Sequence, residues 1–217
     1  MYILLIVGLR ATSCRMSPLR IIWHMKNTII SLVSAIVLLV SFNVQAQQVD
    51  EFRIGGTWAQ PSWLENSHPE SDQTGISAEL LFTPVNIDLF GLSGPNPSNF
   101  MDSLLNPRPH IGAMVNLNDK GTSYVYTGLT WQYEIDPTFF IESSFGFSVN
   151  NGKEDSPTGT RAKLGSHYLF HESIGVGANL TETMTVVLAV EHLSHANLFG
   201  SDNRGLTNVS LRVGHKF

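Results

Sequence analysis

Residues 129–149 read LTWQYEIDPTFFIESSFGFSV, and polar and apolar side chains alternate on both sides of a short EIDP segment at residues 134–137. Alternation with a period of two is typical of a β-strand whose two faces meet different environments. Aromatic residues cluster around the segment, as they do where a membrane barrel meets the lipid–water interface. They are Trp131, Tyr133, Phe139 and Phe140. The stretch therefore predicts an antiparallel hairpin in the wall of a transmembrane β-barrel.

The same alternation recurs in eight runs between residues 52 and 217, each broken by a polar or a Gly, Pro, Asn or Asp cluster. One face of every run is apolar and the other is polar. The polar faces carry Arg53, Glu79, His110, Asn116, Gln132, Glu134, Glu142, Ser144, Glu191, Ser210, Arg212 and Lys216. Side chains just fill the interior of an eight-stranded barrel. We therefore expect a buried network of paired charges there, and no pore.

Two architectures are compatible with this pattern. The predicted fold is all-β, an eight-stranded antiparallel transmembrane β-barrel. The alternative is a soluble antiparallel sandwich, whose strands alternate in the same way with the apolar face inward. The aromatic cluster favours the barrel, as does the last alternating run, which ends on Phe217 in a pattern typical of outer-membrane barrels.

The N-terminal residues favour export. The apolar stretch 29–42 is too short to cross a bilayer comfortably as a helix but has the length of a signal-peptide core. Met25 and Lys26 provide a charged start, and the small residue Ala46 ends a typical cleavage site. We expect residues 1–46 to be an upstream extension and signal peptide, with the preferred start at Met25, and residues 47–217 to form the barrel.

Composition excludes several functions. The chain has 13 basic and 18 acidic residues; four of the basic and none of the acidic ones precede residue 47, so the mature chain carries 9 basic and 18 acidic residues, a net charge of −9. Nucleic acid is therefore not an expected partner. The single cysteine, Cys14, lies in the leader, which excludes a disulfide framework and thiol catalysis. No metal-ligand cluster is apparent, and no cofactor is expected.

The connections between the runs differ in length. Short turns at 134–137 and 181–183 are expected to face the periplasm, and the longer loops 150–165 and 197–205 to face outside. The connection 85–107 is long for a periplasmic turn, and the sequence pattern offers no explanation for it.

The seventh run, MTVVLAVEHLS at residues 184–194, ends in candidate catalytic residues. Because Glu191 must face inward, His192 and Ser194 share the outward face with Val190. Their end of the run is expected near the outer leaflet. An imidazole beside a hydroxyl can activate it to attack an acyl group. The alternative is that both are ordinary polar residues where a strand leaves the membrane.

The order of several short motifs resembles the outer-membrane lipid A 3-O-deacylase family. These motifs are Arg108-Pro109-His110-Ile111-Gly112, Asn116, Gly121-Thr122-Ser123, Tyr126, Gly128-Leu129, Trp131, Leu164-Gly165-Ser166, Leu169-Phe170, His192-Leu193-Ser194, Gly205 and Phe217. The resemblance implies an eight-stranded barrel in the bacterial outer membrane that hydrolyses the ester-linked acyl chain at position 3 of lipid A. It also implies a Ser-His-Glu triad on the lipid-facing wall, with Ser194 as nucleophile and His192 as general base.

Two positions depart from the family pattern. The family commonly has Asn directly after the serine, contributing to the oxyanion hole, whereas this chain has His195. The backbone amides of His195 and Ala196 remain as oxyanion donors. The family glutamate corresponds to Thr207. A hydroxyl there faces outward but cannot stabilise an imidazolium as a carboxylate does.

Glu172 is the second candidate for the third triad member. It shares the parity of Ile174, which places a costly charge on the lipid-facing wall. If the turn at 181–183 pairs Leu180 with Met184, the register places residue 172 opposite His192. A bulge that turns Glu172 inward is the alternative, and Asp202 in the last loop is a weaker candidate.

Two functions follow from these observations. The first is a serine esterase that removes the 3-O acyl chain of lipid A, a component of lipopolysaccharide in the outer leaflet. The second is a catalytically weak or inactive barrel with a structural or surface-interaction role. A homodimer is compatible with either function.

Overall fold

A computed structural model describes residues 48–59, 73–87, 96, 98–119, 121–152, 164–196, 198 and 205–217. The predicted leader 1–46 and the candidate acid Asp202 lie outside the described residues.

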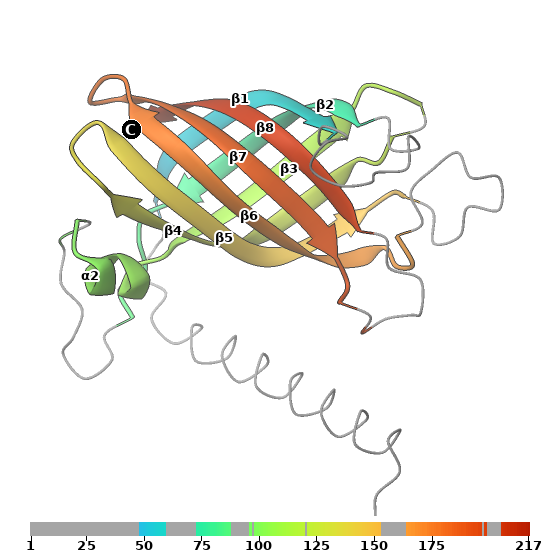
Figure 1. Ribbon diagram of the computed structural model, residues 1–217, viewed down its shortest axis with the longest axis horizontal. Helices are drawn as coiled ribbons and strands as arrows, with labels where there is room; N and C mark the ends of the chain where they lie inside the picture. Colours follow the sequence, from blue (N-terminus) through green and yellow to red (C-terminus); the bar gives the residue numbers. More distant parts are fainter. Residues whose placement is uncertain are drawn as a thin grey trace, which may run out of the picture. The chain divides into compact units, whose positions relative to one another are not determined.

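Eight antiparallel strands form a closed barrel in which each strand pairs with its neighbours in the sequence and β1 pairs with β8 (Figure 1). The strands are β1 (Val49–Ala59), β2 (Thr74–Phe82), β3 (Arg108–Asn116), β4 (Tyr124–Glu134), β5 (Phe139–Asn150), β6 (Tyr168–Asn179), β7 (Met184–Ser194) and β8 (Leu206–Lys216). The predicted fold is confirmed. A sandwich is excluded because the sheet closes on itself and leaves no open edge.

The two faces of the wall have opposite character. Most of the large apolar residues that the strands expose face outward, and Ile174, for example, is 68% exposed. Charged residues face inward, and Arg53 and Glu191 are each 1% exposed. An apolar exterior around a polar interior is the arrangement of a barrel surrounded by lipid.

The prediction is wrong for one of the four interfacial aromatic residues, Phe140. Phe140 faces the interior and is buried against Val187 and Ala189, whereas Phe139 is exposed. Adjacent residues of a strand point to opposite faces, so both could not lie on the outer wall. A Cβ atom on Gly177 would overlap the Phe140 ring. The absence of a side chain at Gly177 therefore makes room for this phenylalanine inside the barrel.

Two tight turns set the register of β4 against β5 and of β6 against β7. In the first, the Ile135 N–H donates to the Phe139 carbonyl over 2.9 Å, and the Asp136 side chain accepts from the Phe139 N–H over 2.7 Å. In the second, the Leu180 N–H donates to the Met184 carbonyl over 2.8 Å. The predicted pairing of Leu180 with Met184 is confirmed.

The long connection 85–107 contains a short helix, α2 (Phe100–Leu105), that lies beside β4 (Figure 1). The Asn99 side chain caps it by accepting from the Met101 N–H over 2.9 Å. The Trp131 Nε1–H of β4 donates to the Leu104 carbonyl over 3.0 Å. This helix occupies six residues of the connection. In the described part of the chain, no helix is long and apolar enough to cross a membrane.

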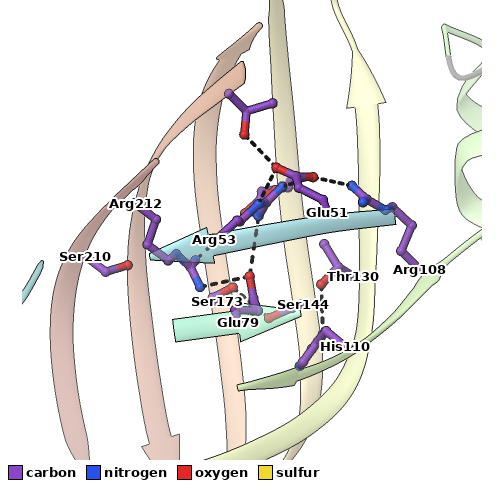
Figure 2. Close-up of polar contacts among 12 residues, drawn as sticks. Glu51, Arg53, Glu79, Arg108, His110, Thr130, Ser144, Ser173, Ser210 and Arg212 are labelled. Atoms are coloured by element: carbon purple, nitrogen blue, oxygen red, sulfur yellow. Dashed lines mark hydrogen bonds and ion pairs between the residues drawn. The ribbon is translucent and has the colours of Figure 1, made fainter. Parts of the chain in front are cut away.

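The barrel interior holds the predicted network of paired charges (Figure 2). Arg53 donates to both carboxylate oxygens of Glu142, over 2.9 and 3.0 Å, and to Glu51 over 2.8 Å. Arg212 Nη1 lies 3.2 Å from Glu79 Oε2 and 3.6 Å from Glu191 Oε1. Because isolated buried charges are strongly unfavourable, these pairs make a filled polar interior tolerable.

We predict that Arg53→Met destabilises the barrel by about 3–5 kcal/mol, because it leaves the buried Glu51 and Glu142 without their shared cation. Reversible urea unfolding of the purified barrel in lipid vesicles measures this change. Lys216→Met is the matched control: Lys216 is half-buried and donates to Asn179 over 2.8 Å. A change of at most about 1 kcal/mol is expected there. Equal effects of the two variants would contradict a special role for the interior network.

Candidate active site

His192 lies in a row of outward-facing residues that runs across five strands. The register pairs Leu129 with Phe145, Phe145 with Glu172, Glu172 with His192, and His192 with Thr207. We call this set the upper row. The predicted position of Glu172 opposite His192 is confirmed, and Glu172 is exposed on the outer wall. The pairing of β6 with both neighbours runs without a register shift, so the alternative of an inward bulge is wrong.

The His192 ring has a hydrogen-bond partner on β8. Its Nδ1 lies 2.8 Å from the Thr207 hydroxyl oxygen. In the part of the chain that the structure describes, no hydrogen bond joins the ring to the Glu172 carboxylate. If Nδ1 carries the proton and donates to Thr207, Nε2 is left with a lone pair that can accept a proton.

Gly205 makes room for the ring at the start of β8. Its φ of 68° lies in the left-handed region, and a Cβ atom there would lie 2.8 Å from His192 Cε1 and 3.2 Å from Nε2. A side chain at this position would therefore be strained and would crowd the ring.

Ser194 is the last residue of β7 and faces the same side as His192. Residues two apart on a strand have Cα atoms roughly 6.8 Å apart on one face. Ser194 pairs with Phe170, which stacks on Phe145 with ring centroids 5.7 Å apart. The serine therefore lies beside an aromatic patch on the wall. Among the described residues, its hydroxyl makes no hydrogen bond to the imidazole.

The chain turns sharply after Ser194. The His195 side chain is 0% exposed and points into the barrel, so it cannot take the part of a side-chain donor on the outer wall. The His195 carbonyl accepts from the Leu198 N–H over 2.8 Å, and Ala196 has a φ of 48°. A left-handed alanine is strained, and such strain concentrates at functional sites.

On the inner side of the same strand, Glu191 fixes the orientation of this end of β7. Its carboxylate accepts from the Tyr124 hydroxyl over 3.0 Å and from the Ser210 hydroxyl over 2.8 Å. With Glu191 held inside, the alternation of the strand directs His192 outward. Sequence reasoning placed Glu191 inside but missed Tyr124, which could have been found from its parity with Tyr126.

An apolar groove on the outer wall begins next to the upper row. Its lining includes a second row of paired residues, Trp131, Ser143, Ile174, Val190 and Val209, which we call the lower row. Each member lies two residues from a member of the upper row, so Val190 and Val209 neighbour His192 and Thr207. The groove also includes Phe100, Ser103 and Leu104 of α2. Sequence reasoning missed it because it depends on register across five strands.

Among the described residues, no group of three or more His, Cys, Asp or Glu side chains could hold a metal ion.

Comparison with known proteins matches this barrel to a family. The family model described as lipid A 3-O-deacylase (PagL) matches residues 116–216, a range that includes the upper row. Over these 101 of its 217 residues the chain is similar to that family. With the closed eight-stranded barrel, this supports an outer-membrane β-barrel, as predicted. A search of curated proteins found no match.

Three solved structures are similar to this chain, and the first of them supports the fold. The crystal structure of the outer-membrane enzyme PagL has a TM-score of 0.50 and 16% identity, covering 78% of this chain and 100% of that chain. A de novo designed transmembrane β-barrel has a TM-score of 0.45 and 9% identity, covering 80% of this chain and 98% of that chain. Ail, an outer-membrane protein of Yersinia pestis, has a TM-score of 0.43 and 10% identity, covering 78% and 100%.

Proposed function

We propose that this barrel is a lipid A 3-O-deacylase like the family that residues 116–216 match, and that it hydrolyses the ester linking the 3-O acyl chain to lipid A with Ser194 as nucleophile. The observation that carries the proposal is the position of His192. Its ring is held 2.8 Å from Thr207 on the lipid-facing wall, with Ser194 two residues further along the same face. A general base beside a hydroxyl on a surface that meets the acyl chains of the membrane suits an esterase with a lipid substrate.

The reaction follows from these positions. His192 Nε2 takes the Ser194 proton while Oγ attacks the ester carbonyl carbon, giving a tetrahedral oxyanion. His192 then gives that proton to the departing 3-hydroxyl of the sugar, leaving an acyl-serine. A water molecule, deprotonated by His192, attacks the acyl-serine and releases the fatty acid. Serine regains its proton from His192.

Backbone amides supply the oxyanion donors. The His195 side chain lies inside the barrel, so we assign the donors to the backbone amides of His195 and Ala196. Among the described residues, no hydrogen bond engages the Ala196 N–H, and the left-handed φ at Ala196 redirects the chain immediately after the nucleophile. Amides fixed in this way stabilise the developing negative charge without reorganising.

Thr207 orients His192 in this proposal, and Glu172 contributes its charge from the other side of the ring. The hydrogen bond favours Thr207, whereas the sequence had left Thr207 and Glu172 both open as the third member. A neutral hydroxyl stabilises an imidazolium less than a carboxylate does. The adjacent Glu172 lies across the strand pair and offsets part of that loss.

Mass spectrometry of lipid A tests the proposal. Cells that express the protein should lose one ester-linked acyl chain from lipid A, with the corresponding mass decrease, and cells without it should not. Unchanged lipid A, with the folded barrel present in the membrane, would favour the second candidate, an inactive barrel. Thr207 in place of the family glutamate is the observation that keeps this candidate open.

We predict that the reaction needs no metal, since the serine, imidazole and backbone amides supply all the required proton transfers and charge stabilisation. Purified protein in detergent should keep its full rate in excess chelator. A rate that falls and recovers on addition of Ca²⁺ would contradict this mechanism and favour a metal-assisted hydrolase.

A further inference from the structure

We propose that α2 closes the far end of the apolar groove and limits the length of the acyl chain that the enzyme accepts. This inference rests on the proposed function, because the chain it concerns is the one whose ester lies at Ser194.

The groove connects the candidate catalytic residues to the helix. Val190 and Val209, at one end, lie two residues from His192 and Thr207 on the same strands, and Leu104 of α2 lies at the other end. The lining is almost entirely apolar. A saturated acyl chain is the occupant that matches both this chemistry and the continuity with the ester-cleaving site.

The distance also fits a long acyl chain. From Ser194 to Val190 the path runs four residues along β7, and from β7 to β4 it crosses three strand spacings. The step along the strand is about 13 Å and the step across the strands, at right angles to it, is about 14 Å. The direct diagonal path along the wall is therefore about 20 Å. An extended long-chain acyl group has a comparable length, whereas a butyryl group ends near the upper row and does not reach α2.

The helix is attached firmly enough to form an end wall. The Trp131 indole N–H donates a hydrogen bond to the Leu104 carbonyl, and the Ser103 hydroxyl donates one to the Gln132 carbonyl. The Phe100 ring packs edge-on against Tyr133, with centroids 6.4 Å apart. All these contacts fix α2 to β4. The Leu104 side chain remains 45% exposed and can meet the end of a bound chain.

Hydrolysis of a series of esters tests the inference. The parent protein and Leu104→Ala are compared on butyryl, lauroyl, myristoyl and palmitoyl esters. Leu104→Ala should raise the palmitoyl-to-lauroyl ratio of kcat/KM by about tenfold, as removal of one side chain from an apolar pocket does. Leu104→Trp should lower kcat/KM on palmitoyl and myristoyl esters relative to kcat/KM on the butyryl ester. Met101→Ala, on the same helix but outside the lining, is the matched control and should keep the parent profile.

The outcomes separate the two claims. If both Leu104 variants keep the parent chain-length profile, α2 does not limit the chain and the inference is wrong. If the parent hydrolyses none of the esters, including butyryl, the proposed function fails.

A binding experiment tests the groove without catalysis. Occupancy of the groove is measured in Ser194→Ala with fatty acids that carry bromine either at the terminal carbon or near the carboxyl group. Terminal bromine should quench Trp131 fluorescence more than bromine near the carboxyl group, with Trp131→Phe as the blank. Equal quenching would overturn the inference independently of catalysis.

Discussion

Ser194→Ala should reduce lipid A deacylation by about 10⁴-fold or more, because loss of a triad nucleophile removes the covalent route and leaves only binding and oxyanion stabilisation. The measurement is the rate at which the purified enzyme releases fatty acid from lipid A, together with lipid A mass spectra from expressing cells. Only the hydroxyl is removed, and Ser194 lies at the end of β7, so the barrel should assemble normally.

The control for this prediction is Ser144→Ala. Ser144 is a strand serine of β5 whose hydroxyl bonds to Ser173 over 2.7 Å, away from the upper row. Its loss should leave the deacylation rate unchanged. Heat-modifiable migration on gels confirms folding of both variants before rates are compared. Full activity in a folded Ser194→Ala protein would reject this residue as nucleophile.

The second large effect concerns the partner of His192. Thr207→Val keeps the shape of the side chain but removes the hydroxyl 2.8 Å from Nδ1, so the ring loses its fixed orientation. We expect kcat to fall by about 10–100-fold, less than the roughly 10⁴-fold that loss of a triad carboxylate costs elsewhere. Glu172→Gln, which removes only a neighbouring charge, should cost less than Thr207→Val.

Thr207→Glu completes the test. A carboxylate at this position would accept a hydrogen bond from Nδ1–H and stabilise the imidazolium, so the rate should rise above that of the parent. The pH dependence of kcat distinguishes an effect on the His192 ring from an effect on folding. A change in the triad acid shifts the apparent pKa of the pH–rate profile, whereas partial misfolding lowers the maximal rate alone. If Glu172→Gln proves more damaging than Thr207→Val, the carboxylate on β6 is the triad acid instead.

The architecture could be predicted because the pattern is local. A period of two along each run identifies the strands and assigns each residue to a face, so Glu191 and Arg53 were placed inside and Ser194 outside. The register of β6 against β7 followed from one tight turn, since pairing Leu180 with Met184 determines each pair along the hairpin. The prediction for Phe140 failed because nearness to the turn placed it with the interfacial aromatic residues, whereas the alternation along β5 turns it inward.

The sequence by itself determined the strand number, the two faces of the wall and the side on which His192, Ser194, Glu172 and Thr207 lie. Tertiary structure alone decided which of the two acid candidates bonds to the ring, because a hydrogen bond depends on the rotamers of His192 and Thr207 and on space beside Gly205. Tertiary structure also determined where the groove lies and where α2 packs. Both arise where strands far apart in the sequence align in rows, and no local periodicity encodes the contact between a connecting helix and Trp131.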